Sequence, residues 1–307
     1  MESPVNNSAK IRELKTYLRE KKATVDAVLR QYAPLSEGPA ARLIEAMRYS
    51  LFSEGKRLRP ILCIAGCEAV GGAEEAVLPV ACALEFIHAY SLIHDDLPLM
   101  DDDDLRRGKP TNHKVFGDAI ALLAGDALLT EAFHLMAATS NASPISAQKN
   151  LEAIRLIADA AGCGGMVGGQ AVDIQSEGAV ADADLVTYMH THKTGALINA
   201  SVVSGALLAG ATDDQLLALA SFGKQIGLAF QISDDILDIE GDTRSLGKRT
   251  GADAEKGKMT YPAVLGLAES RRIQSELILN AVRALDLFDH KADPLRQIAE
   301  YIIERRK

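Results

Sequence analysis

Apolar segments with the period of an α-helix run through nearly the whole chain. In one stretch after another the hydrophobic residues recur at three- and four-residue spacings, and no segment alternates convincingly with a period of two. Since an apolar stripe of helical period cannot be buried by a strand, this pattern predicts an all-α fold. The helices are expected at 11–32, 42–54, 61–70, 74–96, 118–138, 151–162, 182–210, 213–240 and 261–269, followed by closing helices.

Nothing along the chain marks a domain boundary. The polar stretches 140–146 and 241–258 are too short to act as linkers, although 307 residues would be enough for two domains. We therefore expect residues 1–307 to form one domain, a single large bundle of about ten or more helices.

The composition agrees with a helical bundle and limits the partners. Apolar residues make up 48% of the chain but aromatics only 5%, and Ala and Leu are abundant, which favours helices packed closely through small side chains. Lys and Arg number 33 against 42 Asp and Glu, a net charge of −9. That balance argues against nucleic acid as the main partner.

The cysteines and the apolar runs indicate a compartment. Cys63, Cys67, Cys82 and Cys163 all lie in apolar runs, where small buried core residues are expected. A two-ligand metal clip at Cys63 and Cys67 is the alternative. The first ten residues do not read as a signal peptide, and the longest membrane-like stretch, 196–211, is short and interrupted by Ser, Asn and Gly. We expect a cytoplasmic protein without membrane insertion.

Two acidic clusters stand out from the helical pattern. The first, at 91–104, contains Asp95, Asp96 and the run from Asp101; the second, at 231–239, contains Asp234, Asp235 and Asp238. An acidic run is usually a solvated face, and for 102–104 this alternative stays open. Asp95-Asp96 and Asp234-Asp235 have apolar flanks, where unpaired carboxylates are expensive to bury. A divalent cation would offset that cost.

The spacing within the clusters fits a cation site. Asp234 and Asp238 fall on one helix face, with Gln231 one turn earlier. Asp95 and Asp101 would lie about 120° apart on a continuous helix, but Pro98 disfavours helix just before it, and a wider backbone there could bring both carboxylates together. Oxygen ligands used a few at a time suit Mg²⁺ bridging to substrate phosphates.

Four basic groups accompany the acidic clusters. Each alone is most simply a solvated loop, but together with the carboxylates they predict a cavity that holds two diphosphates, with metal on one wall and cations around it. The groups are Gly55–Pro60, 106–109, 193–195 and 247–249.

These motifs, in this order, closely resemble the bacterial-type trans-isoprenyl (polyprenyl) diphosphate synthases, especially the farnesyl diphosphate synthases. Residues 85–114 resemble the first aspartate-rich motif of that family and 234–238 the second, and the resemblance runs from about residue 40 to about 270. It implies helices around a central cavity, a homodimer, and the substrates isopentenyl diphosphate and an allylic diphosphate.

The resemblance also implies roles for individual residues. Asp95 and Asp101 would hold two Mg²⁺ and Asp234 a third, with Asp238 supporting through water and Asp96 and Asp235 beside them. Residues expected to grip the allylic diphosphate are Arg106, Lys193 and Lys248. Thr194 and Gln231 would line the carbocation region, and Lys56, Arg59, His88 and Arg107 would bind isopentenyl diphosphate. For His88 a simple core position is the alternative.

The implied reaction is ionisation, condensation and elimination, and the product length depends on the floor of the cavity. Tyr90, five residues before Asp95, and Ser91 resemble the pattern of synthases with a C15 product, so farnesyl diphosphate is expected, with geranylgeranyl diphosphate as the alternative. Three remoter readings stay open: a helical metal phosphohydrolase, a class I terpene cyclase and a non-catalytic helical subunit.

Overall fold

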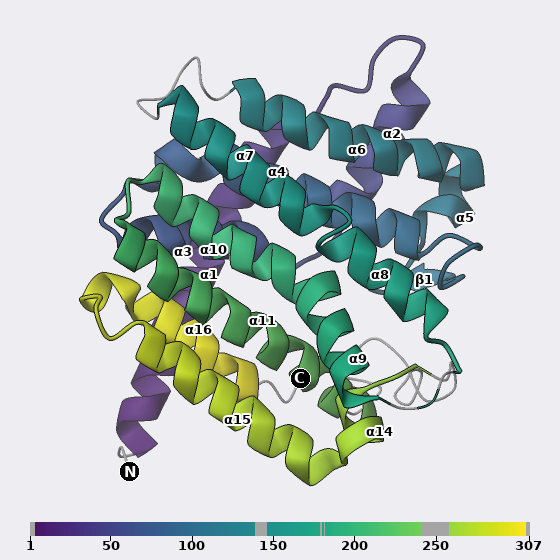
Figure 1. Ribbon diagram of the computed structural model, residues 1–307. Coiled ribbons are helices and arrows are strands. Elements are labelled where there is room, and N and C mark those ends of the chain that lie inside the picture. The colour runs from purple at the N-terminus through teal and green to yellow at the C-terminus, as the bar shows by residue number, and fades with distance from the viewer. Residues whose placement is uncertain (1–3, 139–145, 179, 181, 241–257, 305–307) are drawn as a thin grey trace.

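The computed structural model describes residues 4–138, 146–178, 180, 182–240 and 258–304, and in these it is almost entirely helical (Figure 1). The predicted all-α fold is confirmed. The helices are α1 (Pro4–Tyr32), α2 (Ala41–Leu51), α3 (Leu58–Ala69), α4 (Glu74–Asp95), α5 (Asn112–Phe116), α6 (Asp118–Ala138), α7 (Ala147–Ala161), α8 (Met166–Gln175), α9 (Ala183–Met189), η2 (His190–Gly195), α10 (Ala196–Leu208), α11 (Asp213–Glu240), α14 (Tyr261–Leu265), α15 (Leu267–Ala284), η3 (His290–Ala292) and α16 (Asp293–Glu304).

The structure departs from the expected helices in three places. The helix expected at 182–210 is interrupted by the π-helical turn η2. A π-turn adds a single residue per turn, so the spacing of apolar residues hardly records it. The helices α5 and α8 were not expected, and residues 105–110 form a short antiparallel hairpin of β1 (Leu105–Arg106) and β2 (Lys109–Pro110).

Close packing through small residues, expected from the composition, occurs where α3 crosses α10. A Cβ built on Gly66 of α3 would lie 2.2 Å from the carbonyl oxygen of Val202. A Cβ on Gly205 of α10 would lie 1.8 Å from that of Cys63. Each helix therefore needs glycine at the contact, because any side chain would push the two backbones apart.

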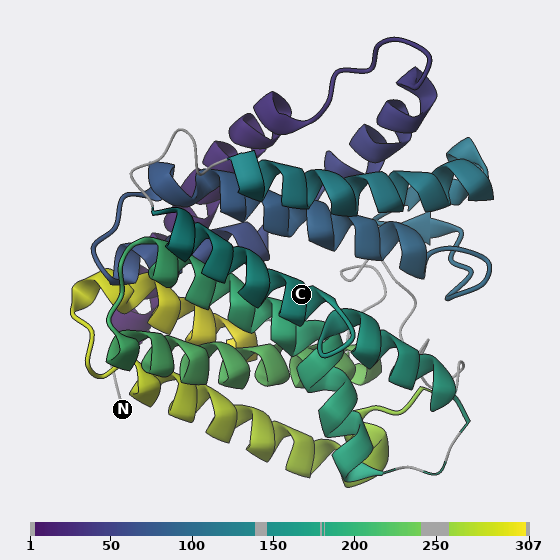
Figure 2. The same cartoon turned by 45° about the horizontal axis from the view of Figure 1, so that its top comes forward.

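The helices that carry the acidic clusters run in the same direction through the bundle. In Figures 1 and 2 the carboxyl ends of α4 and α11 both point toward the side where α8 and α9 lie. Helix α10 packs against both of them, α6 covers the other side of α4, and α15 covers α11. The packing thus brings Asp95 and Asp234 to the same end of the molecule.

Among the described residues, three helices are apolar and long enough to cross a membrane, judged by length and composition alone: α4, α6 and α11. All three are longer than the stretch 196–211, which was the longest membrane-like segment expected from the sequence. In α4, 67% of the most apolar window is buried inside the fold, compared with 44% in α11 and 33% in α6. The apolar side chains of α4 are therefore mostly buried within the bundle. On α6, in contrast, Leu122 and Leu123 are about half exposed, at 46% and 50%.

The four cysteines are free thiols. Cys63, Cys67 and Cys82 are buried, as expected, but Cys163 is exposed. The expectation for Cys163 was wrong because α7 ends at Ala161, and the thiol lies in the turn that leads to α8.

Candidate active site

A cavity of about 950 Å³ opens at the carboxyl ends of α4 and α11. Helix α4 supplies its first acidic wall and α11 its second; η2, α8 and the start of α3 complete it. Of the residues singled out by the sequence, eleven line it: Lys56, Arg59, His88, Tyr90, Ser91, Asp95, Arg107, Lys193, Thr194, Gln231 and Asp234.

The first acidic cluster has the backbone break that Pro98 predicts. Helix α4 ends at Asp95, and the following turn closes with a hydrogen bond of 2.9 Å from the Asp101 amide to the Asp95 carbonyl oxygen. Asp102 takes up the left-handed conformation, with φ of 48°. This six-residue closure brings the backbones of Asp95 and Asp101 together, which a continuous helix would not do.

The carboxyl group of Asp95 has a raised pKa. Burial raises the pKa of its carboxyl group to about 6; Lys193 opposes the rise, and Asp101 and Asp96 add to it. Within the described parts of the chain, no group of three or more His, Cys, Asp or Glu side chains could hold a metal ion by itself. The site thus offers carboxylates that a cation would relieve, but few at any one point, which is the arrangement that suits Mg²⁺ shared with substrate phosphates.

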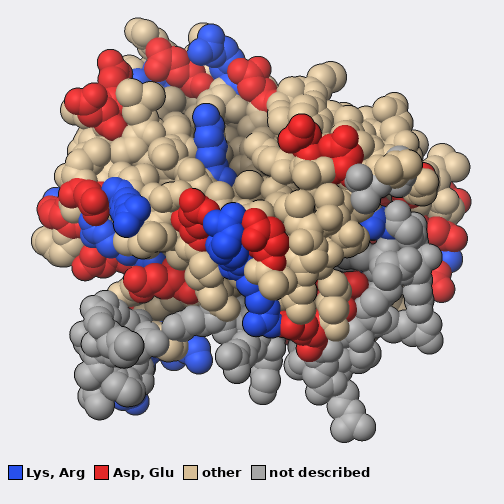
Figure 3. Space-filling view, turned by 60° about the horizontal axis from the view of Figure 1, so that its bottom comes forward, with Lys and Arg blue, Asp and Glu red and all other residues tan. Residues whose placement is uncertain are grey.

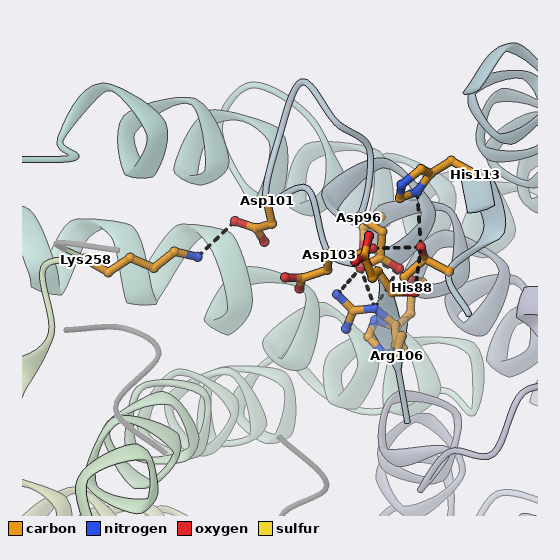
Figure 4. A network of polar contacts seen from close by, with 10 residues as sticks. His88, Asp96, Asp101, Asp103, Arg106, His113 and Lys258 are labelled. Carbon is orange, nitrogen blue, oxygen red and sulfur yellow. Dashed lines mark hydrogen bonds and ion pairs between the residues drawn. The ribbon is translucent and has the colours of Figure 1, made fainter. Parts of the chain in front are cut away.

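Asp96 is committed to Arg106. The guanidinium donates to this carboxylate from Nε at 2.8 Å and from Nη2 at 2.6 Å (Figure 4). Burial alone would lower the pKa of Arg106, but its hydrogen bonds to Asp96 and the charges of Asp96, Asp95 and Asp103 together outweigh burial and raise it. Neither residue lines the cavity, and Asp96, which is 3% exposed, acts here as the anchor of Arg106.

Lys258 was not singled out by the sequence, yet it reaches the first acidic cluster. Its Nζ lies 3.1 Å from Asp101 Oδ1. Figure 4 shows Lys258 on the side of Asp101 that is opposite to Arg106. A lysine 157 residues away in sequence thus contacts a predicted metal ligand. The one available signal was its place at the end of the polar, lysine-rich stretch 241–258.

The second acidic cluster is divided between two environments. Asp234 and Gln231 line the cavity, and Asp238 follows Asp234 by one turn on α11, as predicted. Asp235 is 3% exposed and accepts hydrogen bonds from His190 Nε2 at 2.7 Å and from the Tyr261 amide at 2.9 Å. It is therefore fixed by protein donors.

The π-turn η2 presents Lys193 and Thr194 to the cavity. Lys193 Nζ lies 2.6 Å from Asp173 Oδ2 on α8, and Thr194 Oγ1 donates to Gln231 Oε1 at 2.8 Å. A Cβ on Gly169 would be 2.3 Å from the Lys193 amide nitrogen, so glycine is required where α8 meets η2. Gly169 and Asp173 of α8 thus support the turn that carries Lys193.

A second group of cations gathers at the start of α3. Arg59 and Arg107 both lower the pKa of His88, after burial, well below its usual value, so this ring is neutral. The hairpin between β1 and β2 delivers Arg107, whose Nη1 donates to the Glu54 carbonyl oxygen. Lys56 is exposed at the rim. His88 is thus not an ordinary core residue, since it lines the cavity beside two guanidinium groups.

A buried carboxylate and a half-buried one hold the loop next to these cations. Arg57, in the left-handed conformation with φ of 52°, lies 2.6 Å from Glu85 Oε1 and 2.8 Å from Asp26 Oδ1. The side chains of Arg57 and Glu85 are 5% and 4% exposed. Such a conformation is unfavourable for a side chain as large as arginine and persists only where its surroundings fix it. Neither residue was given a role from the sequence.

Tyr90 and Ser91 lie in the wall of the cavity that α4 forms. Tyr90 is 6% exposed, and its ring meets the ring of His94 edge-on at 5.6 Å. The ring of His94 in turn contacts α6, where His94 Nε2 lies 3.0 Å from the Leu122 carbonyl oxygen. The ring of Tyr90 therefore packs against a histidine that is itself held by α6.

Some predicted elements lie outside the described residues. These are Lys248 with its neighbours in 247–249, most of the stretch 241–258, and the tail 305–307, for which ordering on ligand binding is a prediction.

Known proteins resemble this chain over most of its length, in sequence and in fold. The family model described as polyprenyl synthetase matches residues 40–301. A dimethylallyltranstransferase of Fischerella ambigua (strain UTEX 1903) is 48% identical over 294 residues, covering 95% of this chain and 84% of that protein. A farnesyl diphosphate synthase of Geobacillus stearothermophilus is 48% identical over 289 residues, covering 94% and 97%. The apo crystal structure of an FPP/GFPP synthase from Zymomonas mobilis superimposes with a TM-score of 0.85 at 42% identity, covering 95% and 99%.

Proposed function

Because the chain belongs to the polyprenyl synthetase family, we propose that it joins isopentenyl diphosphate head to tail with dimethylallyl and geranyl diphosphates. The observation that carries this proposal is the single cavity with Asp95 and Asp234 on facing helices and separate groups of cations around it. One cation group is Lys193 on η2, and the other is Arg59 and Arg107 beside α3. Two diphosphates can thus be bound in one space.

We propose that Asp95, Asp101 and Asp234 hold Mg²⁺, three ions in the filled site, with Asp238 supporting. The fit rests on the carboxylate donors, the raised pKa of Asp95 and the lysine already drawn to Asp101. Mg²⁺ bound there would withdraw charge from the departing diphosphate.

The cations of the chain would divide between the two substrates. Lys193, together with Lys258 and Lys248, would neutralise the allylic diphosphate. Arg106, oriented by Asp96, would join them from behind the first acidic cluster. Lys56, Arg59, Arg107 and neutral His88 would hold isopentenyl diphosphate at the other end.

Condensation would proceed through an allylic cation. The allylic C–O bond breaks and its electron pair leaves with the diphosphate; the double bond of isopentenyl diphosphate then attacks the cation, and a proton is lost to the released diphosphate. Thr194 and Gln231, which both line the cavity, would lie beside the cation. The apolar side chains of the cavity, such as Met166 and Phe230, would exclude water that could trap the cation as an alcohol.

The proposed main product is farnesyl diphosphate, with geranylgeranyl diphosphate as the second candidate. Relatives of similar identity carry both names: 48% for the farnesyl synthase of Geobacillus stearothermophilus, and 47% for a geranylgeranyl diphosphate synthase of Cyanophora paradoxa. Support for the shorter product comes from Tyr90, a bulky ring in the cavity wall that packs edge-on against His94.

The test is a product-length assay with Mg²⁺, labelled isopentenyl diphosphate, and dimethylallyl or geranyl diphosphate as the primer. We expect mainly C15 product, lost on chelation with EDTA. In Tyr90→Ala the cavity gains room along the growing chain, so C20 and longer products should increase. Mainly C20 product from the unaltered protein would contradict the farnesyl assignment but not the condensation. Phosphate release with no condensation would favour a phosphohydrolase, and cyclised hydrocarbons a terpene cyclase; an inert protein would favour a non-catalytic subunit.

We further propose a cytoplasmic homodimer without nucleic-acid partners. Figure 3 shows acidic and basic side chains intermixed on one face of the described residues, with no continuous basic surface there. The half-exposed leucines of α6 fit a contact between two copies. Light scattering is expected to give twice the 32.8 kDa of the chain, and cell fractionation to place it in the soluble fraction. A monomeric mass at micromolar concentration would refute the dimer.

A further inference from the structure

Asp235 is the centre of a buried hydrogen-bond network that joins three walls of the site. Its Oδ2 accepts from His190 Nε2 of η2 at 2.7 Å and from the Tyr261 amide of α14 at 2.9 Å. Its Oδ1 accepts, at 3.4 Å, from Gln231 Nε2 on its own helix. The residues His190, Asp235 and Tyr261 are 8%, 3% and 3% exposed. A carboxylate this deep needs its donors, so the three elements are held in one arrangement.

His190 is the first residue of the π-turn that carries Lys193 and Thr194. The far end of the turn also rests on α11, since a Cβ on Gly227 would be 2.7 Å from Gly195 Cα. One end of η2 is therefore fixed by backbone contact and the other by the His190–Asp235 hydrogen bond. An isolated π-turn is a marginal conformation that is frequent at functional sites.

The network continues to the surface of the cavity. Gln231, bound to Asp235, accepts from Thr194 Oγ1 at 2.8 Å, which closes a ring His190–Asp235–Gln231–Thr194 across η2 and α11. Lys193 lies between these anchors and points its Nζ to Asp173. If His190 releases Asp235, Lys193 and Thr194 lose their fixed position relative to Asp234.

We propose that His190 is a positioning residue: through Asp235 it fixes the π-turn so that Lys193 and Thr194 face the allylic diphosphate. This inference rests on the proposed function. The rival explanation is a histidine that only fills the core, its ring tilted 35° to that of Tyr261 with the ring centroids 5.4 Å apart. The two explanations differ in which substrate they affect. Arg59 and Arg107 come from α3 and the β1–β2 hairpin, and no described hydrogen bond links them to the network.

The experiment compares three substitutions at this position in the full chain. His190→Gln keeps an N–H donor where Nε2 lies, whereas His190→Asn moves the donor to the position of Nδ1 and His190→Ala removes it. A misplaced binding group can cost about a hundredfold in rate. We expect His190→Ala and His190→Asn to lower kcat/KM for geranyl diphosphate by about that factor, with KM for isopentenyl diphosphate unchanged and His190→Gln recovering most of the loss.

A binding measurement makes the result independent of turnover. Calorimetric titration with inorganic diphosphate and Mg²⁺ should show weaker binding to His190→Ala and His190→Asn than to His190→Gln. His134→Ala is the matched control, because His134 is an exposed residue of α6, 74% accessible and paired with Glu131.

Each result decides between the explanations. Activity lost equally toward both substrates, in step with the melting temperature, would make His190 a core residue and overturn the proposal, as would full activity of His190→Ala. Equal behaviour of the Asn and Gln variants would overturn it too. If the unaltered protein makes no prenyl product, the proposed function fails as well, so the two failures can be told apart.

Discussion

Replacing Asp95 by Asn is expected to lower kcat/KM for condensation at least about a thousandfold, or about 4 kcal/mol of transition-state stabilisation. Asn keeps the shape of the side chain but removes the charge that the proposed metal site needs at the end of α4. The measurement is steady-state kinetics with geranyl and isopentenyl diphosphates, with Mg²⁺ binding followed by titration. Asp159→Asn on the exposed face of α7 is the matched control and should retain full activity. A loss of less than about tenfold would remove Asp95 from the site.

The same substitution should stabilise the protein when metal is absent. Burial raises the pKa of Asp95 to about 6. At pH 7 the carboxylate is therefore ionised in both states, but the charge is less stable in the folded protein than in the unfolded chain. The rise of this pKa from its ordinary value of 3.8 to about 6 corresponds to at most about 3 kcal/mol, so Asp95→Asn should melt about 2–5 °C higher than the unaltered protein.

The sign of this effect gives it a pH dependence. Folded Asp95 takes up its proton near pH 6, whereas the unfolded residue does so only near 3.8. Above pH 6 the advantage of Asn is therefore complete; it shrinks as pH falls from 6 to 4 and disappears below. With Mg²⁺ and diphosphate present the order should reverse, because they stabilise only the protein that binds them. An Asn variant that melts lower than the unaltered protein at pH 7 without metal would contradict this account.

The parts of the site that the sequence predicts are those fixed by local geometry. Asp234, Asp238 and Gln231 share a face because α11 is a regular helix, and Pro98 ends α4 early enough for Asp101 to fold back toward Asp95. These relations depend on residues within a few positions of one another. The residue roles themselves came from the family resemblance and remain proposals.

What the sequence does not predict are pairings between distant segments. Lys258 meets Asp101 across 157 residues and His190 meets Asp235 across 45, and no periodicity announces either contact. The sequence does not predict the π-turn η2, because the spacing of its apolar residues is nearly that of an α-helix. Arg106 was expected to grip the allylic diphosphate, and its ion pair with Asp96 was not part of that expectation. In each case tertiary packing, rather than local propensity, decides where the charge lies.

Removing the buried carboxylate of Glu85 is expected to cost about 3–5 kcal/mol of folding free energy. Burial alone would lower the pKa of Arg57, and the charges of Glu85 and Asp26 outweigh burial and raise it, so Arg57 stays charged inside the protein. In Glu85→Ala this guanidinium keeps only its bonds to half-buried Asp26 and to the Ser53 carbonyl oxygen, while Arg59 loses the carboxylate that most supports its charge. For a chain of this length the melting temperature should fall by about 5–8 °C.

The loss should also reach the site, because Glu85 holds the strained loop from which Lys56 and Arg59 extend. KM for isopentenyl diphosphate should rise while KM for geranyl diphosphate stays unchanged, since Lys193 is anchored separately by Asp173. Glu269→Ala is the matched control: Glu269 also pairs with an arginine, Arg272, but their side chains are 43% and 60% exposed, and such pairs contribute at most about 1 kcal/mol. If the two variants melt within a degree of each other, burial is not what makes the Arg57–Glu85 pair matter, and the loop at the start of α3 must be held by something else.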